Sequence, residues 1–326
     1  MRNKQNGARL GRTRRPLIGP GASAGPGLAR RFYKHRMIYA LLLPGLVWYA
    51  IFAYGPMGGL ALAFKSFKAS RGIWGSPWAG LVNYRKVFAD PAFFASVLRT
   101  LYINGGRLIF QFPFGIILAL LLNEIKFLRF KKTVQTVFTF PHFLSWIVVA
   151  SVLGNVLGIN GLVNNTLAAL GFDRTSFFGN TRIFQPMLYV TDVWKSAGWG
   201  AIIYLAAIAG IPVDQYEAAE IDGASRTQKV FHITLPNITT TIIVMFILAA
   251  GGIMSTGFDQ VFNLSNVAVR SVSETLDMYI YRVTFQGPTN FSFSMAVSLF
   301  RSVINLAFLL IADRGAKFMG GGGLLG

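Results

Sequence analysis

Few residues of this 326-residue chain have the types and spacing that catalysis requires. Cysteine is absent, and the three histidines, His35, His142 and His232, are far apart in the sequence. A disulfide framework and a thiolate metal site are therefore excluded, and a zinc site is not expected. The sequence contains no Gly-x-x-x-x-Gly-Lys-Ser/Thr pattern, which cradles nucleotide phosphates, and no paired carboxylates or catalytic triad. We therefore expect no enzyme activity in this chain, and no cofactor or metal ion bound to it.

Polar side chains inside apolar segments form a second group with chemical potential. Such residues are costly in a bilayer and usually face a cavity or a partner. Asn104, Arg107 and Gln111 are spaced i, i+3, i+7, so they share one helix face, which we expect to point inward. Asp192 and Lys195 form an i, i+3 pair that either lines a pathway or is mutually neutralised near the membrane edge. The candidate solute-pathway residues are Asn104, Arg107, Gln111, Asn155, Asp192, Lys195, Arg301 and Asn305.

A charged stretch, residues 217–236, lies between two long apolar segments and cannot lie in hydrocarbon. Its first part favours a short helix in which the small Ala218 and Ala219 allow close approach of another surface. Gly223 can take the positive φ that a helix end often requires, although a Cβ at this turn is expected to clash. Further apolar positions follow until Pro236, which is expected to block the second turn and open the next helix. The pattern predicts a helix–turn–helix that lies on a membrane surface and docks in a cleft.

The composition predicts an all-α integral membrane protein, since 53% of the residues are hydrophobic and only 13% are charged. Each of six apolar segments meets the length of roughly 20 residues that a membrane-spanning helix needs. The second and third are joined by a short turn and should form a hairpin. The predicted spans are residues 37–63, 101–122, 134–157, 186–211, 238–258 and 293–313.

The basic residues predict the orientation of these spans. Residues 1–36 contain ten Lys or Arg and no acidic residue, and the turn after the second span adds four more basic residues. Because basic residues gather on the cytoplasmic side, both termini and the 217–236 stretch are expected there. We interpret residues 1–36 as a disordered basic tail, residues 37–313 as the membrane domain, and residues 314–326 as a flexible tail. Nucleic-acid binding is not expected, because no aromatic residues alternate with the charges of the first tail.

The 217–236 stretch resembles the EAA loop of ABC importer permeases at seven spaced positions: Glu217, Ala218, Ala219, Gly223, Ile233, Leu235 and Pro236. The segments 140–146 and 204–210 are also similar to carbohydrate permeases of this family. The resemblance implies a six-helix type I ABC importer permease fold in the bacterial inner membrane. It also implies that the loop, with Asp222 included, is a coupling helix held in a groove of an ATPase subunit. The chain lacks the extra N-terminal spans and the large extracytoplasmic insert of the maltodextrin permease of this family.

The family resemblance implies partners and a substrate class as well. The partners are a second, related permease, two ATPase subunits that bind ATP and Mg²⁺, and an extracytoplasmic solute-binding protein. The substrate is an oligosaccharide, and the basic excess of Arg107, Lys195 and Arg301 over Asp192 favours an acidic one such as alginate fragments. Aromatic residues that either stack on sugar rings or serve packing are Trp146, Tyr189, Trp194 and Trp199.

Two other classes of membrane protein stay open from the residues themselves. A secondary transporter would need an inverted repeat and ion-coupling carboxylates, but no repeat is evident and Asp192 is the only clear acidic residue within a span. A passive channel for a polar solute would not need a docking loop such as residues 217–236.

Overall fold

The computed structural model describes residues 33, 35–255, 257–287 and 289–318. Within these ranges the regular elements are helices, apart from one antiparallel bridge between Lys65 and Trp78. The chain divides into two compact units, residues 1–58 and 59–326. The predicted N-terminal tail lies almost entirely outside the described residues.

The described part of the first unit is an apolar helix. It consists of α2 (Arg36–Trp48) and a π-helical segment, η1 (Tyr49–Tyr54). Large apolar side chains such as Leu41 and Phe52 are exposed along it, as expected of a helix that faces lipid. The helical stretch Arg36–Phe64 is long and apolar enough to cross a membrane, in agreement with the first predicted span.

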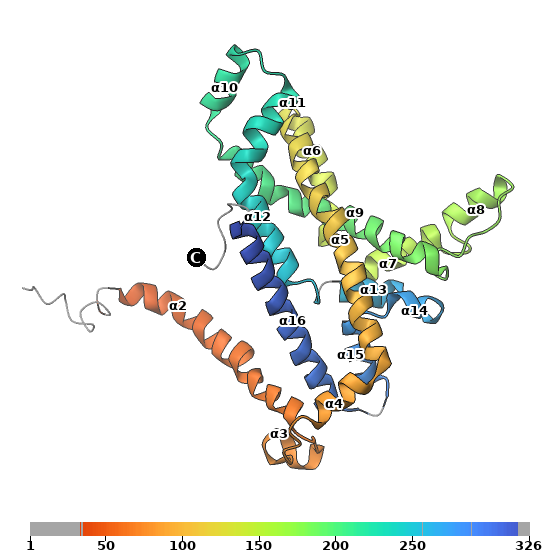
Figure 1. Ribbon diagram of the computed structural model, residues 1–326. Coiled ribbons are helices and arrows are strands. Elements are labelled where there is room, and N and C mark those ends of the chain that lie inside the picture. The colour runs from red at the N-terminus through yellow and green to blue at the C-terminus, as the bar shows by residue number, and fades with distance from the viewer. Residues whose placement is uncertain (1–32, 34, 256, 288, 319–326) are drawn as a thin grey trace, which may run out of the picture. The chain divides into compact units, whose positions relative to one another are not determined.

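The second unit is built on long helices joined by short ones (Figure 1). After η2 (Gly55–Phe64) its elements are η3 (Ala69–Arg71), α3 (Gly72–Gly75), α4 (Val82–Ala89), α5 (Pro91–Asn123), α6 (Leu128–Thr139), η4 (Phe140–Phe143), α7 (Trp146–Leu157), α8 (Leu162–Ala169), α9 (Thr181–Ala209), α10 (Val213–Ile221), α11 (Arg226–Lys229), η5 (Val230–Thr234), α12 (Leu235–Gly251), α13 (Phe258–Leu264), η6 (Val267–Val269), α14 (Arg270–Ser273), α15 (Leu276–Phe285) and α16 (Phe291–Phe318).

Helices α5 and α9 form the central pair of the second unit. Helix α5 begins where the carboxylate of Asp90 accepts a hydrogen bond from the Ala92 amide at 2.8 Å, with Pro91 at its first position. The side chain of Asn180 caps the start of α9 in the same way. A buried cluster that includes Leu122 and Tyr204 holds the two helices together. The pair therefore provides the frame on which the shorter elements are placed.

The predicted third span, residues 134–157, is not one helix. Helix α6 ends at Thr139, a 3₁₀ turn follows, and α7 begins at Trp146 with Ser145 as its cap. Pro141 lies in the turn, where it donates no backbone hydrogen bond, and the chain leaves helical geometry after the turn, at Leu144 (ψ 137°) and Ser145 (ψ 152°). The predicted hairpin is present, because α5 ends at Asn123 and α6 begins at Leu128.

The predicted fifth span, residues 238–258, is displaced toward the 217–236 stretch. The helical stretch runs without a break from Arg226 to Gly251, so Pro236 lies in the first turn of α12 but does not start a separate helix. A π-helical segment, η5, precedes this proline, and the amide of Leu235 bonds to the carbonyl of Val230. This wider turn lets the helix continue through a residue that has no amide hydrogen. The last helix, α16, is longer than predicted and reaches Phe318, so the predicted C-terminal tail is helical over residues 314–318.

Five described helical stretches are long and apolar enough to cross a membrane, or six if α9 and α10 form one broken span. Several short helices lie near the two ends of α5. Helices α4 and α15 lie near its first residues, whereas α10 and α11 lie beyond its last ones (Figure 1). This separation leaves the 217–236 stretch at one end of the helical frame and the segment of α14 and α15 toward the other.

Candidate functional site

The 217–236 stretch forms two short helices that project from the ends of long ones. Helix α9 ends at Ala209, and α10 continues at an angle of 73° after a break that contains Pro212. Glu217 and Ala218 are exposed on α10, and Ala219 is half-buried. The bend directs α10 across the axis of α9, so this helix presents a small, smooth face at the end of the second unit.

The turn after α10 depends on Gly223. Its φ is +75°, a backbone angle that residues other than glycine rarely adopt. The Gly223 amide bonds to the Glu220 carbonyl at 3.1 Å, and the Ala224 amide bonds to the Ala219 carbonyl at 2.9 Å, as in a Schellman motif. The expected Cβ clash is wrong for this chain, because a Cβ at Gly223 would meet no atom within 4 Å. The requirement for glycine therefore comes from the backbone conformation.

Hydrogen bonds hold α10 against the returning helix. Ser225 and Gln228 form a reciprocal capping box at the start of α11. The hydroxyls of Tyr216 and Thr234 are 2.9 Å apart, and Thr234 is buried. Lys229 Nζ donates a hydrogen bond to Glu220 Oε1 at 2.5 Å, and this bond together with the lysine charge lowers the pKa of the exposed carboxyl. These contacts make the two short helices a single preformed element.

The apolar residues of this stretch face two ways. Ile233 and Leu235 are half-buried and pack on a core cluster that contains Ile238. Large apolar side chains on the outer side are exposed, among them Ile221 at 87% and Phe231 at 60%. Exposed apolar side chains next to a charged helix are typical of a surface that binds another protein. Asp222 is also exposed, at the end of α10.

The polar stripe on α5 is divided between two environments. Asn104 and Arg107 are buried, whereas Gln111 is half-buried. Arg107 donates hydrogen bonds to Asn104 Oδ1, at 2.9 Å, and to Gln260 Oε1 on α13. Asn104 Nδ2 donates to the carbonyl of Ile253 at 2.6 Å. The first two residues are therefore buried within the second unit, where they bind the segment after α12.

Two residues absent from the predicted set complete this polar cluster. Gln260 Nε2 donates to the Leu188 carbonyl and to Thr191 Oγ1, both at 2.8 Å, so α13 is tied to α9 as well as to α5. Gly257, with φ of +87°, precedes α13, and a Cβ on it would collide with the Arg107 guanidinium. The only sequence signal for Gln260 is a polar residue in a short helix whose other members are mostly Phe, Val and Leu.

The other candidate pathway residues are distributed over several helices. Lys195 donates to the carbonyls of Pro141 and His142, the latter at 2.8 Å, and so fastens the broken third span to α9. Its neighbour Asp192 is half-buried, with Ser196, Lys195 and Arg107 as electrostatic partners. The remaining positions are an exposed Asn155 on α7, Arg301 paired with Asp277, and Asn305 bonded to Met254 and Ser255.

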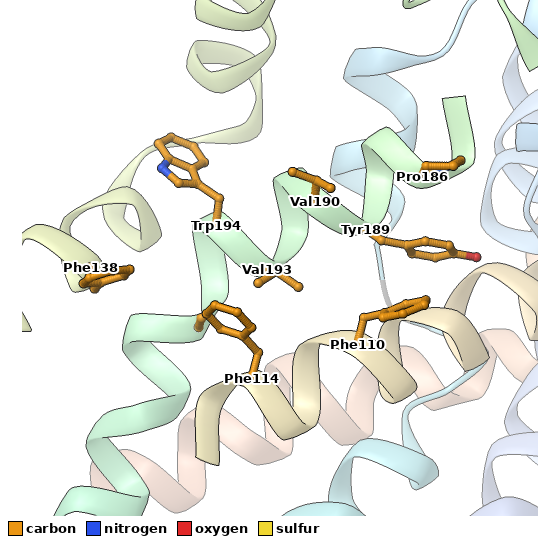
Figure 2. A pocket seen from close by; sticks show the side chains of 9 residues that line it. Phe110, Phe114, Phe138, Pro186, Tyr189, Val190, Val193 and Trp194 are labelled. Atoms are coloured by element: carbon orange, nitrogen blue, oxygen red, sulfur yellow. The ribbon is translucent and has the colours of Figure 1, made fainter. Parts of the chain in front are cut away.

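An apolar groove of about 580 Å³ lies along α9 (Figure 2). Its walls are Phe110 and Phe114 from α5, Phe138 from α6, and Tyr189 and Trp194 from α9. The rings of Phe110 and Tyr189 face one another with their centroids 5.4 Å apart. The other two predicted aromatics serve packing, since Trp199 stacks on His142 and Trp146 lies beside the Lys195 ammonium.

Comparison with known proteins assigns the family. Residues 111–317 match the family model of the binding-protein-dependent transport system inner membrane component. The matched range contains the entire 217–236 stretch and most of the second unit. The chain belongs to this family. This permease is therefore a membrane component of a transport system and neither a secondary transporter nor a passive channel.

Relatives of the permease span most of its length. The polygalacturonan/rhamnogalacturonan transport system permease protein YteP of Bacillus subtilis (strain 168) is 38% identical over 296 residues, 90% of this chain and 92% of YteP. Protein LplB of the same strain is also 38% identical, covering 91% of this chain and 94% of LplB. A crystal structure of a bacterial alginate ABC transporter, in complex with an alginate pentasaccharide-bound periplasmic protein, contains a chain with a TM-score of 0.82 and 34% identity. That match covers 91% of this permease and 99% of the other chain, and it confirms the type I ABC importer permease fold.

Proposed function

We propose that the permease forms one half of the membrane channel of an ATP-driven importer for acidic oligosaccharides. The observation that carries this proposal is the preformed element of α10 and α11, which presents Glu217 and Ala218 together with exposed apolar side chains. Such an element transmits motion to the membrane helices because α10 follows α9 directly and α11 runs into α12. A rigid element of this kind is required when a separate subunit supplies the energy that moves the membrane helices.

The substrate class follows from the relatives and from the candidate pathway residues. Polygalacturonan and alginate both carry a carboxylate on each sugar ring, and these are the polymers associated with a sequence relative and with the similar solved structure. Of the three basic candidates, Arg301 is paired with Asp277, which leaves Arg107 and Lys195 against the single acidic candidate, Asp192. We infer that the aromatic groove along α9 contributes to the pathway, and that Asn104 and Arg107 act by positioning α13 beside it.

The remaining parts of the importer are inferred from the family. Six apolar helices make too thin a wall to enclose an oligosaccharide, so a second permease supplies the other half. Two ATPase subunits bind ATP and Mg²⁺ and grip the 217–236 stretch, which places this stretch and both termini in the cytoplasm. A solute-binding protein delivers the sugar on the opposite side, where residues 65–97 and 259–292 lie. ATP binding favours the outward-facing state and hydrolysis resets the complex, since a ligand shifts an equilibrium only through different affinities for its two states.

The proposal is tested by reconstituting the permease with its partner subunits and its binding protein in proteoliposomes. We expect oligogalacturonate or oligomannuronate to stimulate ATP hydrolysis and to accumulate inside the vesicles, with maltotriose as the neutral control. Stimulation by maltotriose and by neither acidic oligosaccharide would overturn the substrate class. ATP hydrolysis unaffected by every sugar, in a complex that includes the binding protein, would overturn the importer itself.

A further inference from the structure

Three arginines converge on one carboxylate at the end of the second unit that lies away from the 217–236 stretch. Arg99 comes from α5, Arg270 from α14 and Arg282 from α15, and Glu274 lies between the last two helices. Their distances to the Glu274 carboxylate are 4.0 Å for Arg99, 3.2 Å for Arg270 and 2.6 Å for Arg282. We call these four residues the Glu274 cluster.

The Glu274 cluster carries more positive charge than its own carboxylate neutralises. Three guanidiniums and one carboxylate leave a formal charge of two, because arginine stays protonated in proteins. The nearby Arg301 is paired with Asp277 and adds no net charge, while Asp90 binds the Tyr279 hydroxyl at 2.6 Å. Even with Asp90 counted, the neighbourhood stays positive.

The arginines of this cluster remain accessible although the glutamate does not. Their side chains are 28%, 49% and 29% exposed for Arg99, Arg270 and Arg282, whereas that of Glu274 is 11% exposed. Glu274 thus accepts hydrogen bonds from Arg270 and Arg282 and lies 4.0 Å from Arg99, while all three arginine side chains stay partly exposed. A guanidinium has five donors in a planar fork that fits the two oxygens of a carboxylate.

The length of α5 places the cluster outside the hydrocarbon. This helix has 33 residues, about 50 Å at 1.5 Å per residue, whereas the hydrocarbon core of a bilayer is about 30 Å thick. Arg99 lies in the third turn of α5, while Glu124, just after its last residue, lines a pocket with Arg226 and Val230 of the 217–236 stretch. The cluster is therefore on the face of the membrane opposite the coupling element.

That face also carries a net positive charge, although the cytoplasmic side has more basic residues. The segments 64–100, 158–185 and 259–292 contain ten basic and five acidic residues, whereas basic residues usually gather on the cytoplasmic side. A basic excess on the outer face has a use if an anion must be drawn there. Within the described part of this face, the Glu274 cluster brings three of these basic side chains to one carboxylate.

We propose that the Glu274 cluster is an outer carboxylate-binding site, at which a uronate group of the incoming oligosaccharide is held as it leaves the binding protein. This inference rests on the proposed acidic substrate and adds a specific entry site to it. The ligand's carboxylate pairs with the outer edges of Arg99 and Arg270, while Arg282 stays with Glu274. We expect this site to have a low affinity, because partly exposed ion pairs contribute little binding free energy in water.

The test uses the complete importer, trapped outward-facing with a non-hydrolysable ATP analogue and without binding protein. Binding of trigalacturonate and of trimannuronate is followed by saturation-transfer NMR against the double variant Arg99→Gln/Arg270→Gln. Arg282 and Glu274 remain as a 2.6 Å pair in this variant, so the fold keeps its buried carboxylate neutralised. The matched control is Arg85→Gln, an exposed arginine on α4 of the same face.

We expect the double variant to weaken binding by about fivefold for each charge removed, and Arg85→Gln to have little effect. Added salt should weaken the wild-type complex and leave the double variant nearly unchanged. Galactotriose, which has no carboxylate, should bind wild type and variant alike. If the double variant does not assemble, Arg270→Gln alone carries the test, because Arg99 and Arg282 then still neutralise Glu274.

Several results would overturn the inference. Equal binding of the acidic trisaccharides by wild type and variant would show that the arginines serve only the fold. A variant that keeps trisaccharide binding but loses its affinity for the binding protein would show that an acidic protein surface docks there instead. Failure of the proposed function is distinguishable, because the wild-type importer would then show no ATPase response to either acidic sugar in proteoliposomes.

Discussion

At the scale of single residues, Gly223 is the position where one substitution should separate folding from coupling. Its φ of +75° is costly for a β-branched residue by about 1–2 kcal/mol, and no atom lies near enough for a direct clash. We expect Gly223→Val to leave the membrane helices folded and to abolish sugar-stimulated ATP hydrolysis. Gly223→Asn is the matched control, since asparagine tolerates this conformation and should retain transport. Normal transport by Gly223→Val would mean that the turn does not couple the subunits.

Arg107 and Gln260 provide a second residue-scale prediction. Gln260→Leu removes one partner from a buried guanidinium, at a cost of about 3 kcal/mol. Adding Arg107→Met removes the charge itself, so the double variant should have a higher Tm than Gln260→Leu alone. The measurement is the Tm of the purified importer for both single variants and for the double variant. Additive losses of Tm would show that the two side chains do not depend on each other.

The polar stripe on α5 also allows a functional distinction at Arg107. If this arginine acts by holding α13, Arg107→Lys should transport no better than Arg107→Gln. A lysine ammonium cannot replace the planar guanidinium that bonds to both Asn104 and Gln260. If its charge met the sugar directly, Arg107→Lys should transport better than Arg107→Gln. Transport assays of the two variants beside wild type decide between positioning and direct contact, and we expect the two variants to be similarly impaired.

At the scale of elements, the contact of α9 with the end of α6 depends on a missing side chain. A Cβ on Gly198 would collide with the Phe138 carbonyl, whereas a Cβ on Gly200 would meet no atom within 4 Å. We therefore expect Gly198→Ala to destabilise the permease by about 1–3 kcal/mol and Gly200→Ala to be tolerated. The pair lies on one helix two residues apart, which makes Gly200→Ala a close control. Equal Tm values for the two variants would contradict this packing.

The elements also show how interrupted helices create the site. Helix α9 bends into α10 after Ala209, and the π-helical turn η5 carries the returning helix past Pro236. Both irregularities lie where the 217–236 stretch meets the long helices. If α9 continued straight through residues 210–212, α10 would extend along the α9 axis. The 73° bend instead turns Glu217 across the ends of the long helices.

At the scale of the whole molecule, orientation can be tested directly because the chain has no cysteine. Single cysteines at Lys126, between α5 and α6, and at Asp173, after α8, replace exposed residues. We expect a membrane-impermeant maleimide to label Asp173→Cys in intact cells and Lys126→Cys only after permeabilisation. The opposite pattern would reverse the assigned orientation and place the 217–236 stretch outside.

Some features of the permease could be predicted from the sequence alone because they depend on local chemistry. Apolar segments of spanning length, the charged stretch between them and the glycine after α10 each follow from composition or from a single backbone requirement. The six spans, the EAA pattern and the hairpin of α5 and α6 were recognisable for this reason. Their boundaries were less predictable, since Pro141 breaks a span whereas Pro236 does not.

The tertiary structure alone decided which distant side chains meet. Gln260 binds Arg107 although 153 positions separate them, and Glu274 joins arginines from three helices. Periodicity places a residue on a helix face but does not say which helix lies opposite, because that depends on the packing of all the others. The same reason explains Lys195, whose expected partner was Asp192 but whose ammonium bonds to the carbonyls of a broken span. Local sequence thus determined the kinds of elements in this permease, and packing determined what they hold together.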